Sequence, residues 1–479
     1  MVPIQLNRKV KRLFIILFFP IISNAQEFPK GLQLDTTYAL IQAYDEQGLL
    51  KFKRLFDNVD SDKLVFLHYG GSHIQAENPT TVTREFLQNR FGNGGRGLLF
   101  NYGAADTYSS VNYASTFTGK WKYNKSYQGR KPGLPLGVCG MVVETSDSIS
   151  TLTFTMKKPL QRDKYALTVL FENDSISYDF TLWLNGKLIQ NKESTSTEGV
   201  RFDVQDSISK IEIKVLPKTK AERFRFYGIN LINNKQGGVV YHSTGVGASA
   251  FRSILILDKL PDQLPLINPD IVLLDFGTND ILYHNKVESS LPLEVEKAIA
   301  WWRKLCPDVL LVLTSTQDLY YKNHPITAGI TFRNLMDSLA RKNKCLFWNW
   351  YDLSGGLNTI RDWGTLGYAK KDNIHLTKEG YKVKGTMLYR SLINTLEMIT
   401  KGQPLHAFTQ PLKSYVIPVQ EPKSILPPKE KPKNNRYVVK KGETLSLIAR
   451  KNNTSVTKLK KVNGLKSDII KQGQVLRLP

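Results

Sequence analysis

The sequence predicts an α/β protein that is interrupted by an all-β segment and followed by a small β-α-α-β module. Apolar runs alternate with amphipathic helical patterns on both sides of residues 115–233, a segment that itself contains only short alternating runs. A proline-rich stretch then separates residues 436–479 from the rest. The chain has 479 residues, of which 41% are hydrophobic and 23% are charged. This is a globular composition, for which two or three domains are expected.

Residues 27–114 are predicted to form the first part of the α/β domain. An apolar strand at Leu64-Val65-Phe66-Leu67 runs into Gly70-Gly71-Ser72-His73, and a helix is predicted from Thr80 to Phe91. A glycine-rich stretch, 92–97, follows this helix. A strand, a turn and a helix in this order are typical of the opening of an α/β domain.

Residues 115–233 are predicted to form an all-β sandwich that is inserted into the α/β domain. No helical period separates its short runs, which are broken by Asn, Asp, Gly and Lys. The predicted strands are Ser148–Met156, Tyr165–Phe171, Phe180–Leu184, Arg201–Val204, Ile211–Val215 and Phe224–Ile232. The sequence leaves open whether the sandwich binds glycan or only shapes the fold. The same choice, between stacking on sugars and packing in the core, applies to Trp121, Tyr123, Tyr127 and Trp183.

The α/β pattern resumes in residues 234–401. Apolar runs without alternation indicate strands that are buried on both faces, and such strands belong to a mostly parallel sheet with helices on both sides. The predicted strands are Ile271–Phe276, Val309–Thr314 and Cys345–Trp350. The predicted helices are Glu294–Leu305, Thr331–Lys342 and a long helix that begins near Thr377.

Two segments have no place in these domains. Residues 1–25 have the pattern of a secretory signal peptide: a basic region at 8–12, an apolar core at 13–22 and small residues before a cleavage site after Ala25. The alternative is an uncleaved anchor, but the apolar core is short for a membrane span, so no integral span is expected in the mature chain. Residues 402–435 contain seven prolines, which predicts a semi-extended linker.

The charge and the cysteine content limit the classes of molecule that the chain is expected to bind. The chain has 66 Lys+Arg and 42 Asp+Glu, a formal net charge of +24. Residues 421–479 alone hold 15 Lys+Arg and 4 Asp+Glu. In an exported protein this excess favours anionic envelope polymers over nucleic acid; the alternative is a basic surface that only aids solubility. Three cysteines are too few for a disulfide scaffold, and no Cys/His spacing indicates a metal, so neither metal nor cofactor is expected.

The last segment, residues 436–479, is predicted to fold as strand, helix, helix and strand. Its run YVVKKGETLSLIARKNNTSVTKLKKVNGL, closed by IIKQGQVLRL, resembles the LysM repeat over the whole module. The resemblance implies binding of glycan that contains N-acetylglucosamine, chiefly peptidoglycan. In such modules the sugar lies between two loops, which correspond here to Gly442, Glu443, Thr444, Leu445, Ile470, Lys471, Gln472 and Gly473.

Three short blocks carry side chains suited to catalysis. Gly70-Gly71-Ser72-His73 follows the first predicted strand, and Gly277-Thr278-Asn279-Asp280 follows the strand Ile271–Phe276. Asp372-Asn373-Ile374-His375 lies just before the last helix. Open α/β sheets hold their sites at the carboxyl edge of the strands, so these blocks converge if their strands are neighbours.

In this order the blocks resemble those of the SGNH hydrolases, the GDSL esterase superfamily, and Gly245-Val246-Gly247-Ala248 falls where that family has its oxyanion glycine. The resemblance implies a three-layer, flavodoxin-like α/β/α domain. It makes Ser72 the nucleophile, His375 the base and Asp372 the residue that orients the base. The oxyanion donors would be the backbone N–H groups of Ser72 and Gly247 and the side-chain amide of Asn279. Asp280 is expected to brace its own loop, and His73 to be a packed turn histidine.

The whole chain is similar to periplasmic peptidoglycan O-acetylesterases, whose SGNH domain is interrupted after the first block by a sandwich like a carbohydrate-binding module. The similarity implies a secreted esterase of the periplasm or cell envelope that removes O-acetyl groups from peptidoglycan without a metal or cofactor. Gly71 stands where the family usually has Asp. This departure leaves the alternative that the chain is an inactive protein that only binds the wall. The sequence is also compatible with an esterase for another acetylated polysaccharide and with an acetyltransferase.

Overall fold

The computed structural model describes residues 31–190, 192–417, 436–452, 454–465 and 467–478. The predicted signal peptide and most of the predicted linker lie outside these residues. The chain divides into two compact units, the first ending at Tyr415 and the second beginning at Val416. Across the described ranges, none of the helices has both the length and the apolar character needed to cross a bilayer.

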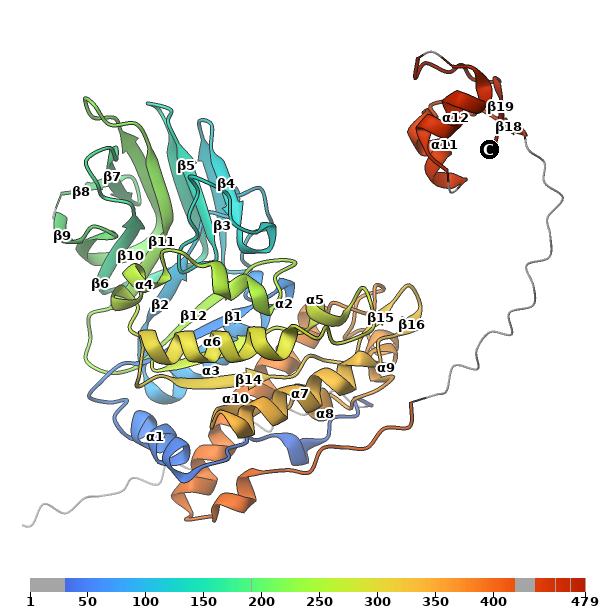
Figure 1. Cartoon of the computed structure of the whole chain (residues 1–479). Coiled ribbons are helices and arrows are strands. Elements are labelled where there is room, and N and C mark those ends of the chain that lie inside the picture. The colour runs from blue at the N-terminus through green and yellow to red at the C-terminus, as the bar shows by residue number, and fades with distance from the viewer. Residues whose placement is uncertain (1–30, 191, 418–435, 453, 466, 479) are drawn as a thin grey trace, which may run out of the picture. The chain divides into compact units, whose positions relative to one another are not determined.

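A parallel sheet forms the centre of the α/β part of the first unit. Within the described residues the strand order is β17-β14-β13-β1-β12-β2, and each neighbouring pair is parallel (Figure 1). This confirms the mostly parallel sheet. The bounds are β1 (Leu64–Gly70), β2 (Asn93–Leu99), β12 (Val239–Gly245), β13 (Ile271–Asp275), β14 (Leu310–Thr314) and β17 (Leu346–Trp348).

Helices cover both faces of this sheet, as predicted. Successive side chains of β1 point to opposite faces, so Phe66 joins the core that includes Phe52 and Leu87, whereas Leu67 joins the core that includes Trp302 and Phe332. The first face carries α1 (Glu46–Asp57), α3 (Asn78–Phe91) and α10 (Lys378–Thr400), and the second carries α6 (Leu291–Leu305) and α7 (Ala328–Lys342).

Shorter elements lie in the connections of the α/β part. They are η1 (Thr36–Tyr38), α2 (Ser72–Gln75), η3 (Phe251–Ile256), α4 (Leu260–Gln263), η4 (Leu264–Leu266), α5 (Thr278–Ile281), β15 (Tyr320–Tyr321), β16 (His324–Pro325), α8 (Trp350–Leu353), α9 (Thr359–Thr365) and η5 (Leu405–Phe408).

The inserted segment is all-β, but two of its strands are longer than predicted. Most of the predicted segment Ser148–Met156 and all of Tyr165–Phe171 fall on one strand, β6, which begins at Thr151, because β10 pairs with the polar stretch between them. Likewise Arg201–Val204 and Ile211–Val215 are parts of the single strand β10. The insertion comprises β3 (Tyr113–Thr118), β4 (Lys122–Lys125), η2 (Ser126–Gln128), β5 (Met141–Thr145), β6 (Thr151–Phe171), β7 (Asp179–Leu184), β8 (Lys187–Ile189), β9 (Lys192–Ser196), β10 (Gly199–Leu216) and β11 (Phe224–Asn233).

The glycine-rich stretch 92–97 contributes most of β2, a strand that the sequence did not predict. β2 pairs with β12 on one side and antiparallel with β11 on the other, so it joins the insertion to the parallel sheet. A Cβ added at Gly94 would lie 2.9 Å from the backbone of Gly238, and one at Gly95 would lie 2.7 Å from Cα of Ile232. Glycine is needed because the neighbouring backbones approach so closely.

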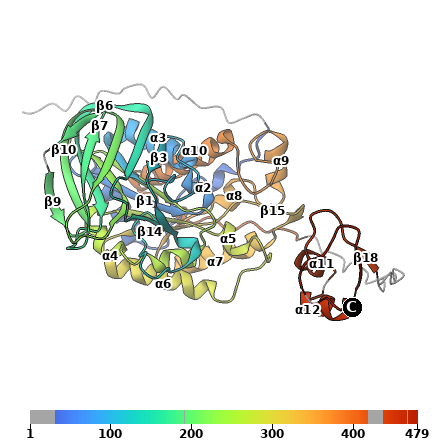
Figure 2. The ribbon, with the colours of Figure 1, turned by 90° about the horizontal axis from the view of Figure 1, so that it is seen from above.

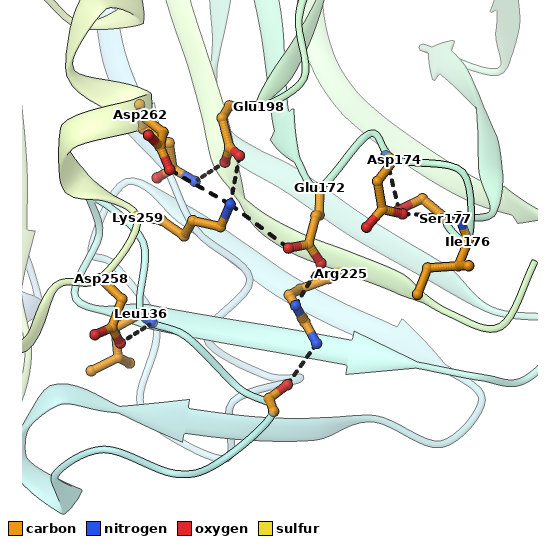
Figure 3. Close-up of polar contacts among 12 residues, drawn as sticks. Leu136, Glu172, Asp174, Ile176, Ser177, Glu198, Arg225, Asp258, Lys259 and Asp262 are labelled. Atoms are coloured by element: carbon orange, nitrogen blue, oxygen red, sulfur yellow. Dashed lines mark hydrogen bonds and ion pairs between the residues drawn. The ribbon is translucent and has the colours of Figure 1, made fainter.

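Ion pairs also fix the insertion to the α/β part. Lys259, which immediately precedes α4, places its ammonium 2.7 Å from Glu198 and 3.7 Å from Glu172 of the insertion. Figure 3 shows this lysine between the two carboxylates, with the Arg225 guanidinium on the other side of Glu172. These ion pairs add to the strand pairing that joins the insertion to the sheet.

Part of the predicted linker belongs to the first unit. Phe408 is fully buried, and the Tyr415 hydroxyl donates a 2.7 Å hydrogen bond to Asp352. The stretch 402–415 therefore packs on the α/β part, because its apolar and aromatic side chains outweigh the influence of its prolines. Cys139, Cys306 and Cys345 are all free thiols.

The second unit has the predicted β-α-α-β order. β18 pairs antiparallel with β19, and the small core includes Leu445, Ile448, Leu459 and Leu476. The bounds are β18 (Arg436–Val438), α11 (Leu445–Lys451), α12 (Val456–Asn463) and β19 (Val475–Arg477).

Candidate active site

The strand ends that carry the candidate residues meet at one edge of the sheet. Gly70, the last residue of β1, is in register with Gly245 at the end of β12 and with Asp275 at the end of β13. The turns that follow these three strands therefore lie side by side at the carboxyl edge, the usual place for sites in open α/β sheets.

Ser72, His375 and Asp372 form a continuous hydrogen-bonded chain. Ser72 begins α2, and its Oγ lies 2.8 Å from Nε2 of His375. The other ring nitrogen, Nδ1, lies 2.8 Å from Oδ2 of Asp372. With the Nδ1 proton directed at this carboxylate, Nε2 is the acceptor for the serine hydroxyl. Residues 303 positions apart in the sequence thus form the arrangement that a serine nucleophile requires.

The loop that carries Asp372 and His375 is held from several sides. Oδ1 of Asp372 accepts the backbone N–H groups of Ile374 and His375, each at 2.9 Å, and the Gln317 side chain donates to Ile374 O at 2.7 Å. Burial alone would raise the pKa of Asp372, but its hydrogen bonds with the His375 side chain and with the two backbone N–H groups outweigh burial and lower it. The carboxylate is therefore ionised and fixed in position.

The donors for a developing oxyanion are only partly free. Among the described residues no hydrogen bond engages the backbone N–H of Ser72, whereas Asn279, on α5, uses one amide N–H to reach Ser249 O at 2.9 Å. The N–H of Gly247 donates at 2.6 Å to Oε1 of Gln75. In this arrangement Gly247 is not available to an oxyanion, which differs from the role expected for it, because the Gln75 side chain occupies its donor.

Gln75 and Tyr108 border the site, and the sequence assigned neither of them a role. The Gln75 amide donates to Thr107 Oγ1 and Tyr108 O, both at 2.9 Å, and the Tyr108 hydroxyl lies 3.3 Å from Ser72 O. Thr107 and Tyr108 lie in the loop between β2 and β3, which leads into the insertion. The position of Gln75 next to Ser72 was visible in the sequence, but nothing marked Tyr108.

Gly71, the departure from the usual Asp, lies against Asn279. A Cβ added at Gly71 would be 3.0 Å from the Asn279 amide nitrogen and 3.3 Å from Ser249 O. The missing side chain therefore leaves room for this amide beside Ser72. Asp280 braces the same turn, since its carboxylate accepts the backbone N–H groups of Gly277 at 2.9 Å and Phe251 at 3.0 Å.

Buried polar groups lie near the candidate catalytic residues. His73 is buried, its Nδ1 lies 2.9 Å from the Tyr381 hydroxyl, and burial holds its pKa well below the usual value. This agrees with the packed turn histidine that the sequence predicted. The sequence did not predict the buried pair at the end of β13, in which the Lys384 ammonium lies 2.8 Å from Asp275.

In the second unit, the residues expected to bind glycan lie on two loops that are tied together. The backbone N–H of Gly473 donates to Val439 O at 2.8 Å, which ties the segment 470–473 to the residues just before the segment 442–445. Several of their side chains have internal roles: Leu445 is buried, Thr444 caps α11, and Glu443 binds Lys451 at 2.6 Å. Ile470 is partly buried and packs against the small core, whereas Lys471 and Gln472 are exposed. Within the described ranges, no three His, Cys, Asp or Glu residues are grouped as metal ligands would be.

Comparisons with known proteins agree with both units. Residues 215–383 match the model of the GDSL-like Lipase/Acylhydrolase family, and residues 437–479 match the LysM domain. Ser72 lies outside the first match, since the insertion separates its block from the other two.

One solved structure, described as a peptidoglycan O-acetylesterase in action, covers 74% of this chain and 99% of its own, with 18% identity and a TM-score of 0.61. A family two carbohydrate esterase from Clostridium thermocellum covers 58% of this chain and 99% of its own, at 11% identity and a TM-score of 0.27. A probable peptidoglycan endopeptidase, LytE, from Bacillus subtilis (strain 168) is 57% identical over 42 residues, which are 9% of this chain and only 13% of that relative.

Proposed function

We propose that the chain is an exported SGNH-type esterase that removes O-acetyl groups from peptidoglycan. The matches of residues 215–383 to the GDSL-like Lipase/Acylhydrolase family and of residues 437–479 to the LysM domain support this proposal. The observation that carries the proposal is the 2.8 Å contact between Ser72 Oγ and His375 Nε2, with Asp372 bound to the opposite ring nitrogen. A hydroxyl needs such a base, because it is otherwise too weakly acidic to attack an ester.

The reaction proceeds in two steps. His375 takes the Ser72 proton as Oγ attacks the acetyl carbonyl, and it then gives that proton to the sugar oxygen that leaves. Water, deprotonated by the same imidazole, attacks the acetyl-serine, and acetate departs as Ser72 regains its proton. The oxyanion of each intermediate is stabilised by the Ser72 N–H and by the second amide proton of Asn279. Gly247 becomes a third donor only if Gln75 releases it.

The LysM domain supports peptidoglycan as the substrate. A module that holds the chain on the wall raises the local concentration of acetylated glycan around the esterase. Removal of the acetyl group would free the hydroxyl of the amino sugar for enzymes that require it unmodified.

The test is acetate release from O-acetylated sacculi by the purified full-length chain. Replacement of Ser72 by Ala should lower kcat by about 10³-fold or more, because the nucleophile is lost while binding remains. Equal release by the wild type and by Ser72→Ala would remove this mechanism. A fluorophosphonate probe that labels the wild type but not Ser72→Ala would exclude an inactive wall-binding protein, and release from acetylated xylan at the rate seen with sacculi would redirect the substrate assignment.

A further inference from the structure

A groove of about 960 Å³ runs along α3 at the junction of the α/β part and the insertion. It is lined by α3 from Asn78 to Gln88, about 15 Å of helix, by the middle of β6 and by the first turns of α10. Figure 2 shows α3 and α10 side by side, and Thr83 Oγ1 on α3 donates to Gly385 O on α10 at 3.0 Å. We call this feature the α3 groove.

The walls of the α3 groove are strongly cationic. Six basic side chains and only two acidic ones, Glu85 and Glu379, line it, which gives a net charge of +4. Four exposed lysines from two different elements line it, and no ion pair of the described residues involves any of them. They are Lys157 and Lys158 on β6 and Lys378 and Lys382 on α10.

The two remaining cations, Arg84 and Arg96, share one buried carboxylate. Oε2 of Glu77 lies 2.7 Å from Arg96 Nη2 and 3.4 Å from Arg84 Nη1, and it also accepts the Asn112 amide at 3.0 Å. Arg96 is 7% exposed, and its second amine, Nη1, has no protein partner in the described part of the chain. Burial, and then the nearby Arg96, lower the pKa of Arg84 to about 10, so the Arg84 guanidinium stays charged at neutral pH. One carboxylate between two guanidinium groups leaves the floor of the groove positive.

One end of the α3 groove is lined by Asn78 and Lys378, which are close in the chain to the candidate catalytic residues. Lys378 is three residues beyond His375, and Asn78 begins α3 directly after the short helix that Ser72 opens. Val111, another lining residue, donates its backbone N–H to Ala76 O at 2.9 Å. The segments that form this end of the α3 groove therefore follow Ser72 and His375 within a few positions in the chain.

We propose that the α3 groove binds carboxylate groups of the same acetylated strand whose ester is placed at Ser72, so that the enzyme selects an anionic glycan over a neutral one. The inference rests on the proposed function and adds to it the class of substrate. Peptidoglycan carries free carboxylates on its stem peptides and, where a stem is missing, on its lactyl groups. The unpaired lysines supply the long-range attraction, and the guanidinium groups favour the planar carboxylate.

The first experiment measures KM and kcat on O-acetylated sacculi for Lys157→Gln/Lys158→Gln in the full-length chain. The control, Lys297→Gln/Lys304→Gln, removes two exposed charges from α6, on the opposite face of the sheet. We expect the groove variant to raise KM about 3- to 10-fold at low salt, because exposed charge pairs are each worth a fraction of a kcal/mol, with the control at the wild-type value. The difference should vanish at high salt. Equal KM values for both variants at low salt, or a difference that persists at high salt, would overturn the proposal.

A second experiment separates this inference from the esterase assignment. Binding of polygalacturonate, a glycan with carboxylates but no N-acetylglucosamine, is measured with full-length Ser72→Ala as the background. Adding the groove substitutions should weaken binding at least threefold relative to adding the control substitutions, whether or not the wild type releases acetate; equal binding would reject the groove. The experiment is then repeated with sacculi treated with an amidase, which removes stem peptides with their carboxylates and leaves free lactyl carboxylates. This shows which of the two carboxylates the groove binds. A groove effect that survives indicates the lactyl group, and one that disappears indicates the stem peptide.

Discussion

Replacement of Asp372 by Asn tests whether the carboxylate fixes the proton on His375. Oδ1 of Asp372 accepts two backbone N–H groups, those of Ile374 and His375, while Oδ2 faces the imidazole. In the variant the amide oxygen must take the place of Oδ1, because an NH₂ group there would face two donors. The amide nitrogen then faces Nδ1 of His375, which places the ring proton on Nε2. Nε2 can no longer accept the Ser72 proton.

The size of the effect follows from that geometry. A wrong tautomer in a buried triad costs about 10⁴-fold in kcat. The Asp372 side chain is 43% exposed, so water replaces part of what is lost. We expect a fall of about 10³-fold, or about 4 kcal/mol of transition-state stabilisation. The assay is steady-state hydrolysis of a soluble acetyl ester, with the rate of fluorophosphonate labelling of Ser72 as a second readout.

The matched control is Asp308→Asn, whose carboxylate is fully exposed and whose ion pair with Lys51 is 3.4 Å long. It changes the same chemical group away from the site, and a surface pair contributes at most about 1 kcal/mol to stability. If folded Asp372→Asn keeps its kcat within about tenfold of the control, where the tautomer argument requires a much larger loss, Asp372 does not orient His375 and the triad assignment is wrong.

Two further predictions concern the turns around the nucleophile. In Gly71→Ala the added Cβ meets the Asn279 amide at 3.0 Å. We expect kcat to fall about tenfold with little change in Tm, a smaller effect than that of removing a whole oxyanion donor. A rate equal to wild type would show that this amide is not a donor. Burial raises the pKa of Asp280 from 3.8 to about 6, although the backbone N–H groups of Phe251 and Gly277 oppose the shift. The folded state therefore binds the proton more tightly, and this contribution is present below pH 4 and lost as the pH rises through 6, a change of about 3 kcal/mol. Urea unfolding should show the advantage of wild type over Asp280→Asn shrinking across that range, and an advantage that grows with pH would contradict the assignment.

The sequence predicted the regular part of the fold because that part carries a period. α3, α6, α7 and α10 lie where helical patterns indicated them, and the apolar runs became β13 and β14. The strand at residues 92–97 could not be predicted in this way, because glycines carry no pattern of apolar and polar side chains. These glycines allow β2 to lie close to the backbones of its two neighbouring strands. The sequence predicted two strands in place of β6, because the polar residues in its middle resemble a loop. Only the pairing with β10 shows that the strand is continuous.

The candidate site divides in the same way. Ser72, Asn279, Asp372 and His375 could be selected from the sequence, since each lies in a short block beside a strand or helix end. The distances between these side chains could not be predicted, because they depend on the strand order of the whole sheet. The occupied N–H of Gly247 was also hidden, since it depends on the rotamer of a side chain 172 positions away.

The insertion does more than interrupt the domain, because its strands and the catalytic strands belong to one sheet. β2 ends in the loop that carries Tyr108 to Ser72, and Ser126, after β4, lies 2.9 Å from Ser249 in the turn that the Asn279 amide contacts. A displacement of the insertion would therefore move both sides of the nucleophile. β6 also forms one wall of the α3 groove, so the position of the insertion affects both the groove and the contacts around Ser72.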